Sequence, residues 1–212
     1  FDYGGVLAKM IDDSFIHHMA DSLNADFDLF RTALWKFRSD YDQGVLKAKD
    51  YWRLVAEHAR GSWPSEQMDQ DELVETLMLI DTLAYLSFNV GLLRWIRTLR
   101  SKNYRCIIIS NMSGETYDNL IKGTFLESYF DQMIISGWLH INKPDLGIFQ
   151  AAMRKMQVEP EEILFLDDLE HNVEGAKKAG LHAVQFTTTQ ELDTYLSAKY
   201  PDLPRTGLVC NR

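Results

Sequence analysis

Short apolar runs that end in polar residues are the feature that most constrains how this chain folds. The run CIII at 106–109 leads into Ser-Asn, and the run ILFL at 163–166 leads into Asp-Asp. Such runs are typical of strands buried on both faces of a parallel sheet. Weaker runs at 132–135 and 182–186 predict two further strands. Phe1-Asp2 has the form of a strand's last step, and we expect the biological chain to begin a few residues earlier.

Stretches with helical periodicity separate these runs, at 90–100, 146–156 and 172–179. Alternating strands and helices predict an α/β fold, a doubly wound (Rossmann-like) parallel sheet with right-handed crossovers. In such sheets, ligands bind beyond the carboxyl ends of the strands. Each predicted strand carries its polar residues to that edge, so we expect the functional residues to converge there.

Residues 11–87 break this alternation. Helical periods cover 13–22, 27–40, 49–59 and 69–85, with turn signals at 42–44 and 61–64. We therefore predict an α/β core made of 1–10 and 88–212, with 11–87 inserted as an all-helical cap over the strand ends. Aromatic residues recur at helical spacing in this segment, which favours packing within the cap over contact with a ligand.

Charge and cysteine content exclude several classes of partner. The 31 acidic residues outnumber the 22 basic ones and give a formal charge of -9, which argues against nucleic-acid binding. No apolar stretch reaches the roughly 18 residues that a membrane span needs, and the first residues lack a signal-peptide pattern. Cys106 and Cys210 match no metal-ligand spacing. We expect a cytoplasmic protein without nucleic-acid or membrane partners, either a monomer or a homodimer.

The adjacent carboxylates of Asp167 and Asp168 carry the strongest chemical signal in the sequence. Two carboxylates in a confined site repel one another, so a proton or a cation must relieve them. Carboxylate and carbonyl oxygens suit Mg²⁺. We interpret the pair as a metal site rather than as a purely structural feature.

Three weaker signals lie at other predicted strand ends. Asp2 precedes two glycines that let a ligand approach the backbone closely, although a strand exit capped by an Asp has the same pattern. Ser110-Asn111 suits an oxyanion, but a helix N-cap is the better reading of that pair by itself. Lys143 precedes Pro144, the expected first residue of a helix, where a cation needs an anion beside it.

Taken in order, FDYGGVL, IIISN, NKPDLGIF and FLDDLEHNVEGAKKAG resemble the four motifs of the haloacid dehalogenase-like hydrolase superfamily. The helical insertion resembles the type-one cap of that superfamily. Within it, the chain is most similar to sugar-1-phosphate phosphatases and to the phosphatase domain of soluble epoxide hydrolase. The resemblance implies a Mg²⁺-dependent phosphatase that acts on a small phosphorylated metabolite.

The resemblance also assigns roles to individual residues. Asp2 would be the nucleophile that forms an aspartyl-phosphate, a known use of a carboxylate. The metal ligands would be Asp2, the Gly4 carbonyl, Asp168 and, directly or through water, Asp167. The phosphoryl oxygens would be held by Ser110, Asn111 and Lys143, and the metal's surroundings would be oriented by Asn172.

Gly4 departs from the superfamily pattern, because most of its phosphatases carry a second Asp there that moves a proton. General acid–base help is typically worth ~10²–10⁴-fold, so its loss predicts poor turnover of ordinary alkyl phosphates. We favour an intrinsically good leaving group, as in a sugar-1-phosphate or an acyl phosphate. The other possibility is a residue that reaches in from the cap, for which the nearby titratable candidates are Asp12, Asp13, His17 and His18.

Two other functions fit the missing acid. A metal-independent 2-haloacid dehalogenase also uses an Asp nucleophile, but that branch typically carries Ser-Asn where this chain has Asp167-Asp168. A non-catalytic binding protein with the same fold is favoured by Gly4 and disfavoured by the presence of Asp2, Lys143 and Asp168.

Overall fold

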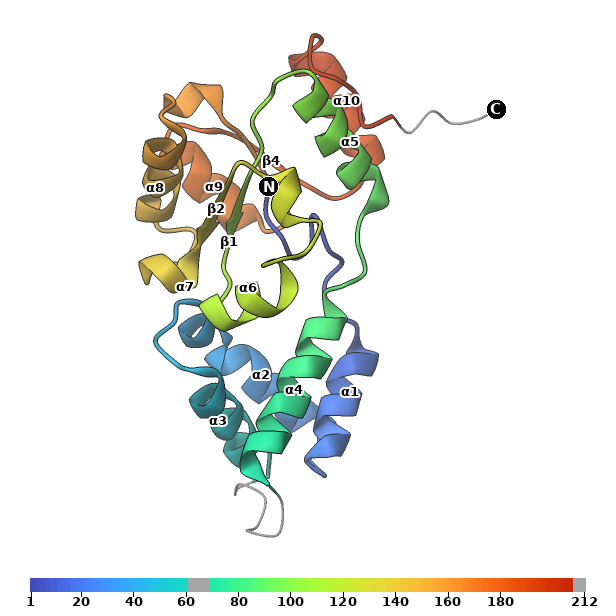
Figure 1. Cartoon of the computed structure of the whole chain (residues 1–212), viewed down its shortest axis with the longest axis vertical. Coiled ribbons are helices and arrows are strands. Elements are labelled where there is room, and N and C mark those ends of the chain that lie inside the picture. Colours follow the sequence, from blue (N-terminus) through green and yellow to red (C-terminus); the bar gives the residue numbers. More distant parts are fainter. Residues whose placement is uncertain (61–68, 208–212) are drawn as a thin grey trace, which may run out of the picture.

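A computed structural model describes residues 1–60 and 69–207 of the chain (Figure 1). The turn predicted at 61–64 and Cys210 lie outside these residues. The described chain has an α/β fold in which parallel strands alternate with helices, as predicted.

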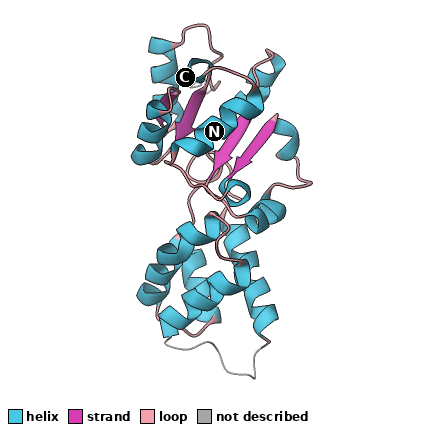
Figure 2. Ribbon diagram, turned by 90° about the vertical axis from the view of Figure 1, so that its left-hand side faces the viewer, coloured by secondary structure: helices cyan, strands magenta, loops and turns pink. Residues whose placement is uncertain are grey.

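The sheet is built from short parallel strands. Strand β1 (Ile107–Ser110) pairs with β2 (Gln132–Ile135), and β3 (Leu164–Asp167) pairs with β4 (His182–Gln185). In Figure 2 the strand arrows point toward the helical half of the molecule. The polar residues that follow the strands therefore face that half.

Phe1 and Asp2 lie between the two strand pairs and join them. Phe1 accepts a hydrogen bond from the backbone N–H of Ile109 (2.9 Å), and the backbone N–H of Asp2 donates to Leu166 (2.9 Å). Asp2 therefore lies at the centre of the sheet, beside the ends of β1 and β3.

Alternate residues of the strands pack on opposite faces of the sheet, as the period of two requires. Ile107 and Ile109 pack with α8 (Leu146–Met156) and α9 (Glu170–Lys178). On the other face, Ile108 packs with α5 (Val90–Ser101) and α10 (Thr189–Lys199). Helices on both faces explain why the strands are continuous apolar runs.

Four short segments complete this half of the chain: the helices α6 (Gly114–Leu120) and α7 (Ser136–Leu139), and two 3-10 turns, Glu127–Tyr129 and Pro160–Glu162. The expected helix start at Pro144 is wrong. Helix α8 begins at Leu146, because the Asp145 side chain caps it by accepting a hydrogen bond from the Gly147 N–H (2.7 Å).

The described residues between Asp2 and α5 form four helices with a hydrophobic core of their own. They are α1 (Asp13–Ser22), α2 (Phe27–Asp42), α3 (Ala48–Arg60) and α4 (Gln70–Ala84). Phe30, Tyr51 and Trp52 are fully buried in that core, so these aromatic residues pack within the helical segment as predicted.

Polar contacts fasten the connection between α2 and α3 to the α/β half. Ser136 Oγ donates to the Asp42 carbonyl (2.7 Å), and the Ala48 N–H donates to a Glu115 carboxylate oxygen (3.0 Å). Gly44, which has a φ of 75°, approaches the backbone of Gly137 so closely that a Cβ would lie 2.8 Å from its carbonyl oxygen. Among the described residues, no helix combines the length and apolarity needed to cross a bilayer.

Candidate active site

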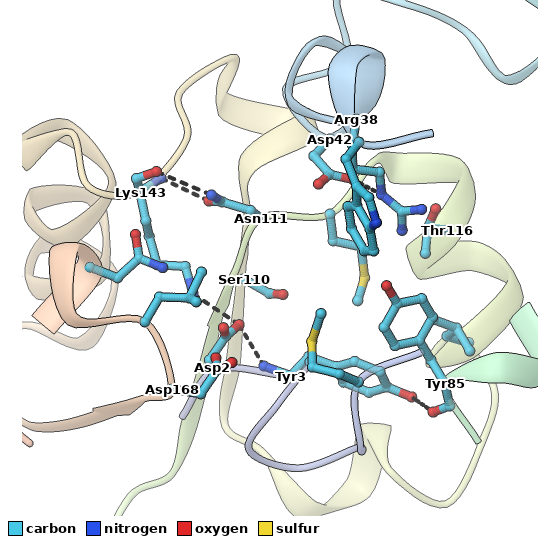
Figure 3. A pocket seen from close by; sticks show the side chains of 17 residues that line it. Asp2, Tyr3, Arg38, Asp42, Tyr85, Ser110, Asn111, Thr116, Lys143 and Asp168 are labelled. Atoms are coloured by element: carbon cyan, nitrogen blue, oxygen red, sulfur yellow. Dashed lines mark hydrogen bonds and ion pairs between the residues drawn. The ribbon is translucent and has the colours of Figure 1, made fainter. Parts of the chain in front are cut away.

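A cavity of about 180 Å³ lies between the strand ends and the four helices (Figure 3). Seven of the eight predicted site residues line it: Asp2, Gly4, Ser110, Asn111, Lys143, Asp168 and Asn172. The eighth, Asp167, lies directly behind them and is completely buried. Folding thus brings together residues from four separate parts of the sequence.

The three carboxylates form one cluster, because Asp2, Asp167 and Asp168 each offer an oxygen within 4.8 Å of the others. Asp2 is held by the N–H of Tyr3, which donates to its Oδ1 (2.7 Å). Burial raises the pKa of Asp2 to about 7, with Asp167 adding to the rise and Lys143 opposing it. The Asp2 carboxyl group therefore needs positive charge beside it to be ionised at neutral pH.

Lys143 supplies part of that charge. Its Nζ lies 2.9 Å from Asp2 Oδ1 and 2.6 Å from Asp167 Oδ2, and the residue is only 3% exposed. Burial alone lowers the pKa of Lys143, but the two carboxylates raise it above its ordinary value, so the ammonium group stays charged. The anion expected beside Lys143 from the sequence is therefore this pair of carboxylates, Asp2 and Asp167.

Asn111 fixes the backbone from which Lys143 projects. Its side-chain amide donates to the Lys143 carbonyl (3.1 Å), and its Oδ1 accepts from the Lys143 N–H (2.7 Å). Ser110, at the end of β1, is 2% exposed and lines the cavity. Ser110 and the end of the Lys143 side chain thus meet beside Asp2.

Asp167 accepts hydrogen bonds from three donors. Its Oδ1 accepts from the Leu169 N–H (2.9 Å) and from Asn172 Nδ2 (3.0 Å), and its Oδ2 accepts from Lys143. Burial raises its pKa, but Lys143 and these hydrogen bonds outweigh burial and lower it below the ordinary value. Asp167 therefore holds Lys143 and Asn172 in place and lies one layer behind the cavity surface.

Asp168 faces the cavity instead. Burial and the adjacent charge of Asp167 raise its pKa. Asp168 can take this position because Gly5 has no side chain. A Cβ at Gly5, whose φ is 75°, would lie 2.3 Å from the Asp168 carboxylate.

Asn172 provides a test of whether a cation fits. Its Oδ1 is buried at the cavity and has no hydrogen-bond partner among the described residues. A buried acceptor without a donor is costly, and a water on a metal ion would supply one. The cluster also holds three carboxylates against the single ammonium of Lys143. Oxygen donors with net negative charge fit a hard divalent cation such as Mg²⁺.

The four residues named as alternative proton donors, Asp12, Asp13, His17 and His18, are not among those that line the cavity. Asp12 caps α1, Asp13 pairs with Arg31 at 3.7 Å, and His17 stacks on Phe27. His18 is exposed on the same helix. All four lie on α1 or its cap, away from the end of α2 that meets the strand ends.

A charged cluster that the sequence did not predict lies on the helical side of the cavity. Arg38 Nε donates to Asp42 Oδ1 (3.0 Å), and Arg38 Nη1 donates to both oxygens of Asp81 (3.0 and 3.2 Å). Arg38 and Asp42 line the cavity, and Asp81 lies behind them on α4. The i,i+4 spacing of Arg38 and Asp42 was the available signal.

Comparison with known proteins places the chain in a family. The haloacid dehalogenase-like hydrolase family matches residues 53–186. The chain belongs to this family.

Individual relatives resemble parts of the chain. The pyrophosphatase PpaX of Bacillus mycoides is 26% identical over 107 residues, which are 50% of each protein. The mouse acyl-CoA dehydrogenase family member 10 is 30% identical over 109 residues, 48% of this chain but 10% of that protein. The chain thus matches about half of the length of the first relative and a tenth of the second.

Solved structures share the fold over most of the chain. A HAD family enzyme from Bacteroides thetaiotaomicron, in complex with magnesium and inorganic phosphate, has 21% identity and a TM-score of 0.68, with 88% of this chain and 91% of that chain covered. The L-2-haloacid dehalogenase from Xanthobacter autotrophicus has 16% identity and a TM-score of 0.62, with 94% and 81% covered. At these identities the likeness shows the fold alone.

Proposed function

We propose that this chain is a Mg²⁺-dependent phosphatase of a small phosphorylated metabolite, with Asp2 as the nucleophile. The observation that carries the proposal is the meeting of Asp2, Lys143 and Asp168 at one end of a small cavity. The PpaX relative, named as a pyrophosphatase, and the magnesium and phosphate of the Bacteroides neighbour support the same chemistry.

In this proposal the metal is held by Asp2, Asp168 and the Gly4 carbonyl. Asp167 contributes through water, because its oxygens already accept hydrogen bonds from the protein. The open Oδ1 of Asn172 would accept a hydrogen bond from a water on the metal. Bound Mg²⁺ would supply Lewis-acid chemistry by neutralising charge on the phosphoryl oxygens.

The chain's own residues then carry the reaction. An Asp2 carboxylate oxygen attacks phosphorus and forms an aspartyl-phosphate, which water later hydrolyses. Lys143 favours the ionised form of Asp2 and, with Ser110 and the backbone of Asn111, stabilises charge on the transferred phosphoryl group. Lys143 is fixed before substrate arrives, since Asn111 and Asp167 hold it from two sides.

The size of the cavity supports a small-molecule substrate. Its volume of about 180 Å³ is below the roughly 300–1,000 Å³ that holds drug-sized ligands. A sugar-1-phosphate or an acyl phosphate is of suitable size and has a good leaving group. These are the substrate classes that we propose to test first.

We also propose that residues 11–87 act as a cap on a core made of 1–10 and 88–212. Trp35, Arg38 and Asp42 of this segment line the cavity opposite the strand ends. Side chains of the cap therefore select the leaving group in this account.

The experiment is a phosphate-release assay with 4-nitrophenyl phosphate and a panel of small phosphorylated metabolites, with and without Mg²⁺. Activity that requires Mg²⁺ and is abolished in Asp2→Asn supports the proposal. Halide release from a 2-haloacid without metal would instead identify a dehalogenase. No turnover in either assay would favour a non-catalytic binding protein.

A further inference from the structure

The proposed reaction still lacks a general acid, because Gly4 has no side chain to protonate the leaving group. Four other titratable side chains that line the cavity are poor proton donors at neutral pH. Arg38 and Lys143 are held as cations by buried carboxylates. Burial raises the pKa of Tyr3 and of Tyr85 well above the ordinary value.

Asp42 is the remaining candidate outside the metal cluster, and the protein fixes it from two sides. Arg38 Nε donates to its Oδ1 (3.0 Å), and its carbonyl accepts from Ser136 Oγ (2.7 Å). Ser136 is itself completely buried and accepts from the Met112 N–H (2.9 Å). Although Asp42 belongs to the helical segment, the α/β half therefore holds its backbone.

The second carboxyl oxygen of Asp42 is available to a ligand. Asp42 lines the cavity, and its Oδ2 makes no hydrogen bond with any of the described residues. Figure 3 shows Asp42 and Arg38 on one wall of the cavity and Asp2 with Asp168 on the other. In phosphoryl transfer, the attacking and leaving oxygens lie roughly in line on opposite sides of phosphorus. Attack from Asp2 therefore directs the leaving oxygen toward the wall that carries Asp42.

We propose that Asp42 is the catalytic acid and base of this site, in the role that Gly4 leaves open. This inference rests on the proposed phosphatase function. In the first step, an Asp2 oxygen forms a bond to phosphorus and the bond from phosphorus to the leaving oxygen breaks. The leaving oxygen keeps the electron pair and takes the proton of the Asp42 carboxyl group, which gives an alcohol and an Asp42 carboxylate.

In the second step, the Asp42 carboxylate takes a proton from a water molecule as the water oxygen bonds to phosphorus. The bond between phosphorus and Asp2 breaks and returns its electron pair to the Asp2 carboxylate. The products are inorganic phosphate and a protonated Asp42, so the site is restored without another reactant.

The surroundings of Asp42 suit both steps. Burial raises its pKa to about 6, with Asp81 adding to the rise and with Arg38 and Lys143 opposing it. Arg38 on α2 and Asp81 on α4 are its charged neighbours within the helical segment, and Lys143 acts from the α/β half. A group with a pKa near the working pH both gives and takes a proton efficiently.

The test compares two substrates of nearly the same shape, 4-nitrophenyl phosphate and phenyl phosphate, with Mg²⁺ present. Nitrophenolate is a weak base and leaves without being protonated. Phenolate is a stronger base, so its departure depends much more on a proton from a general acid. Asp42→Asn should raise the ratio of the two kcat/KM values by about 10²-fold or more, because acid help is worth ~10²–10⁴-fold. The control is Asp40→Asn, an exposed Asp on the same helix outside the cavity lining, which should leave the ratio unchanged.

A second readout does not depend on turnover. The carboxyl carbon of Asp42, followed by NMR over pH, should titrate well above an ordinary Asp, and Asp81→Asn should lower its midpoint. An unchanged substrate ratio in Asp42→Asn, or an ordinary midpoint, would overturn the inference while leaving the nucleophile Asp2 intact. If wild type hydrolyses neither ester while 2-haloacid is turned over, the phosphatase proposal itself fails.

Discussion

The carboxylate of Asp168 occupies the space beside Gly5 where any other residue would place its Cβ. A Cβ at Gly5 would lie 2.3 Å from the Asp168 carboxyl carbon, and the φ of 75° is one that side chains rarely adopt. Neighbouring Gly4 has no such restriction, since a Cβ there would lie 3.6 Å from its nearest neighbours, Met10 and Tyr85. The two adjacent glycines therefore have different reasons to be present.

Gly5→Ala should displace Asp168 and weaken the site's affinity for Mg²⁺. Disturbing the residues around a metal ligand typically costs 10–100-fold in affinity, and we expect a loss of about this size. Isothermal titration with Mg²⁺ measures it. Gly4→Ala is the matched control, because its Cβ makes ordinary van der Waals contacts and should leave the affinity nearly unchanged. Equal affinities in both variants would contradict a metal site at Asp168.

Gly4→Asp should rescue Asp42→Asn. A Cβ at position 4 points toward the cavity-lining side chains of Met10 and Tyr85, so the new carboxyl group would enter the cavity. It would offer the proton that the Asp42→Asn variant cannot supply. We expect the double variant to recover phenyl phosphate turnover by at least about tenfold over Asp42→Asn. No recovery, with normal folding by circular dichroism, would argue that Asp42 acts in some other way than as an acid.

Lys143→Met should destabilise the fold, because it leaves two buried carboxylates without their cation. Removing one partner of a buried ion pair typically costs about 3–5 kcal/mol. Urea unfolding measures the loss. Lys122→Met removes an exposed pair with Asp118 and should cost little. A similar small loss for both variants would show that Lys143 does not neutralise the cluster.

As the pH rises, the free energy of unfolding of wild type should decrease relative to that of the Asp42→Asn variant. The folded-state pKa of Asp42 is about 6 against an ordinary 3.8, so the folded chain holds this proton more tightly than the unfolded chain. The contribution to stability is thus fully present below about pH 3.8 and is lost as the pH rises through about 6. Because one pKa unit is worth about 1.36 kcal/mol, the loss amounts to about 3 kcal/mol.

Urea unfolding of both proteins between pH 4 and pH 8 measures this difference. The unfolding free energy of Asp42→Asn relative to wild type should increase with pH. A difference that stays constant, or one that decreases, would contradict a raised pKa at Asp42.

The sequence predicted the strand ends because apolar runs are local signals. Asp2, Ser110 and Asp167 each follow or end such a run, and parallel strands bring their ends to one edge of the sheet. Helices with a strong apolar face were also found, and α8 (Leu146–Met156) covers the amphipathic segment predicted at 146–156, although Pro144 is not its first residue. Helix α10 was missed because it buries only Leu192 and Leu196, which gives little periodicity.

The charged cluster opposite Asp2 had no comparable signal. Arg38 meets Asp81 across 43 positions in the sequence, and only the packing of α2 against α4 brings them together. The acids and histidines of α1 are closer to Asp2 in the sequence than Arg38 and Asp42 are. However, α1 packs into the core of the helical segment, and none of its residues lines the cavity. Contacts between helices distant in sequence, such as α2 and α4, are therefore the part of this site that sequence patterns could not predict.

Asp2 should become phosphorylated during turnover, and trapping this aspartyl-phosphate is the decisive experiment. The protein is mixed with 4-nitrophenyl phosphate and Mg²⁺, quenched in acid and reduced with borohydride, which converts an aspartyl-phosphate to homoserine. Peptide mass spectrometry should then find homoserine at position 2 in wild type and none in Asp2→Asn. Phosphate release by wild type without homoserine at position 2, or with homoserine at another aspartate, would contradict the account.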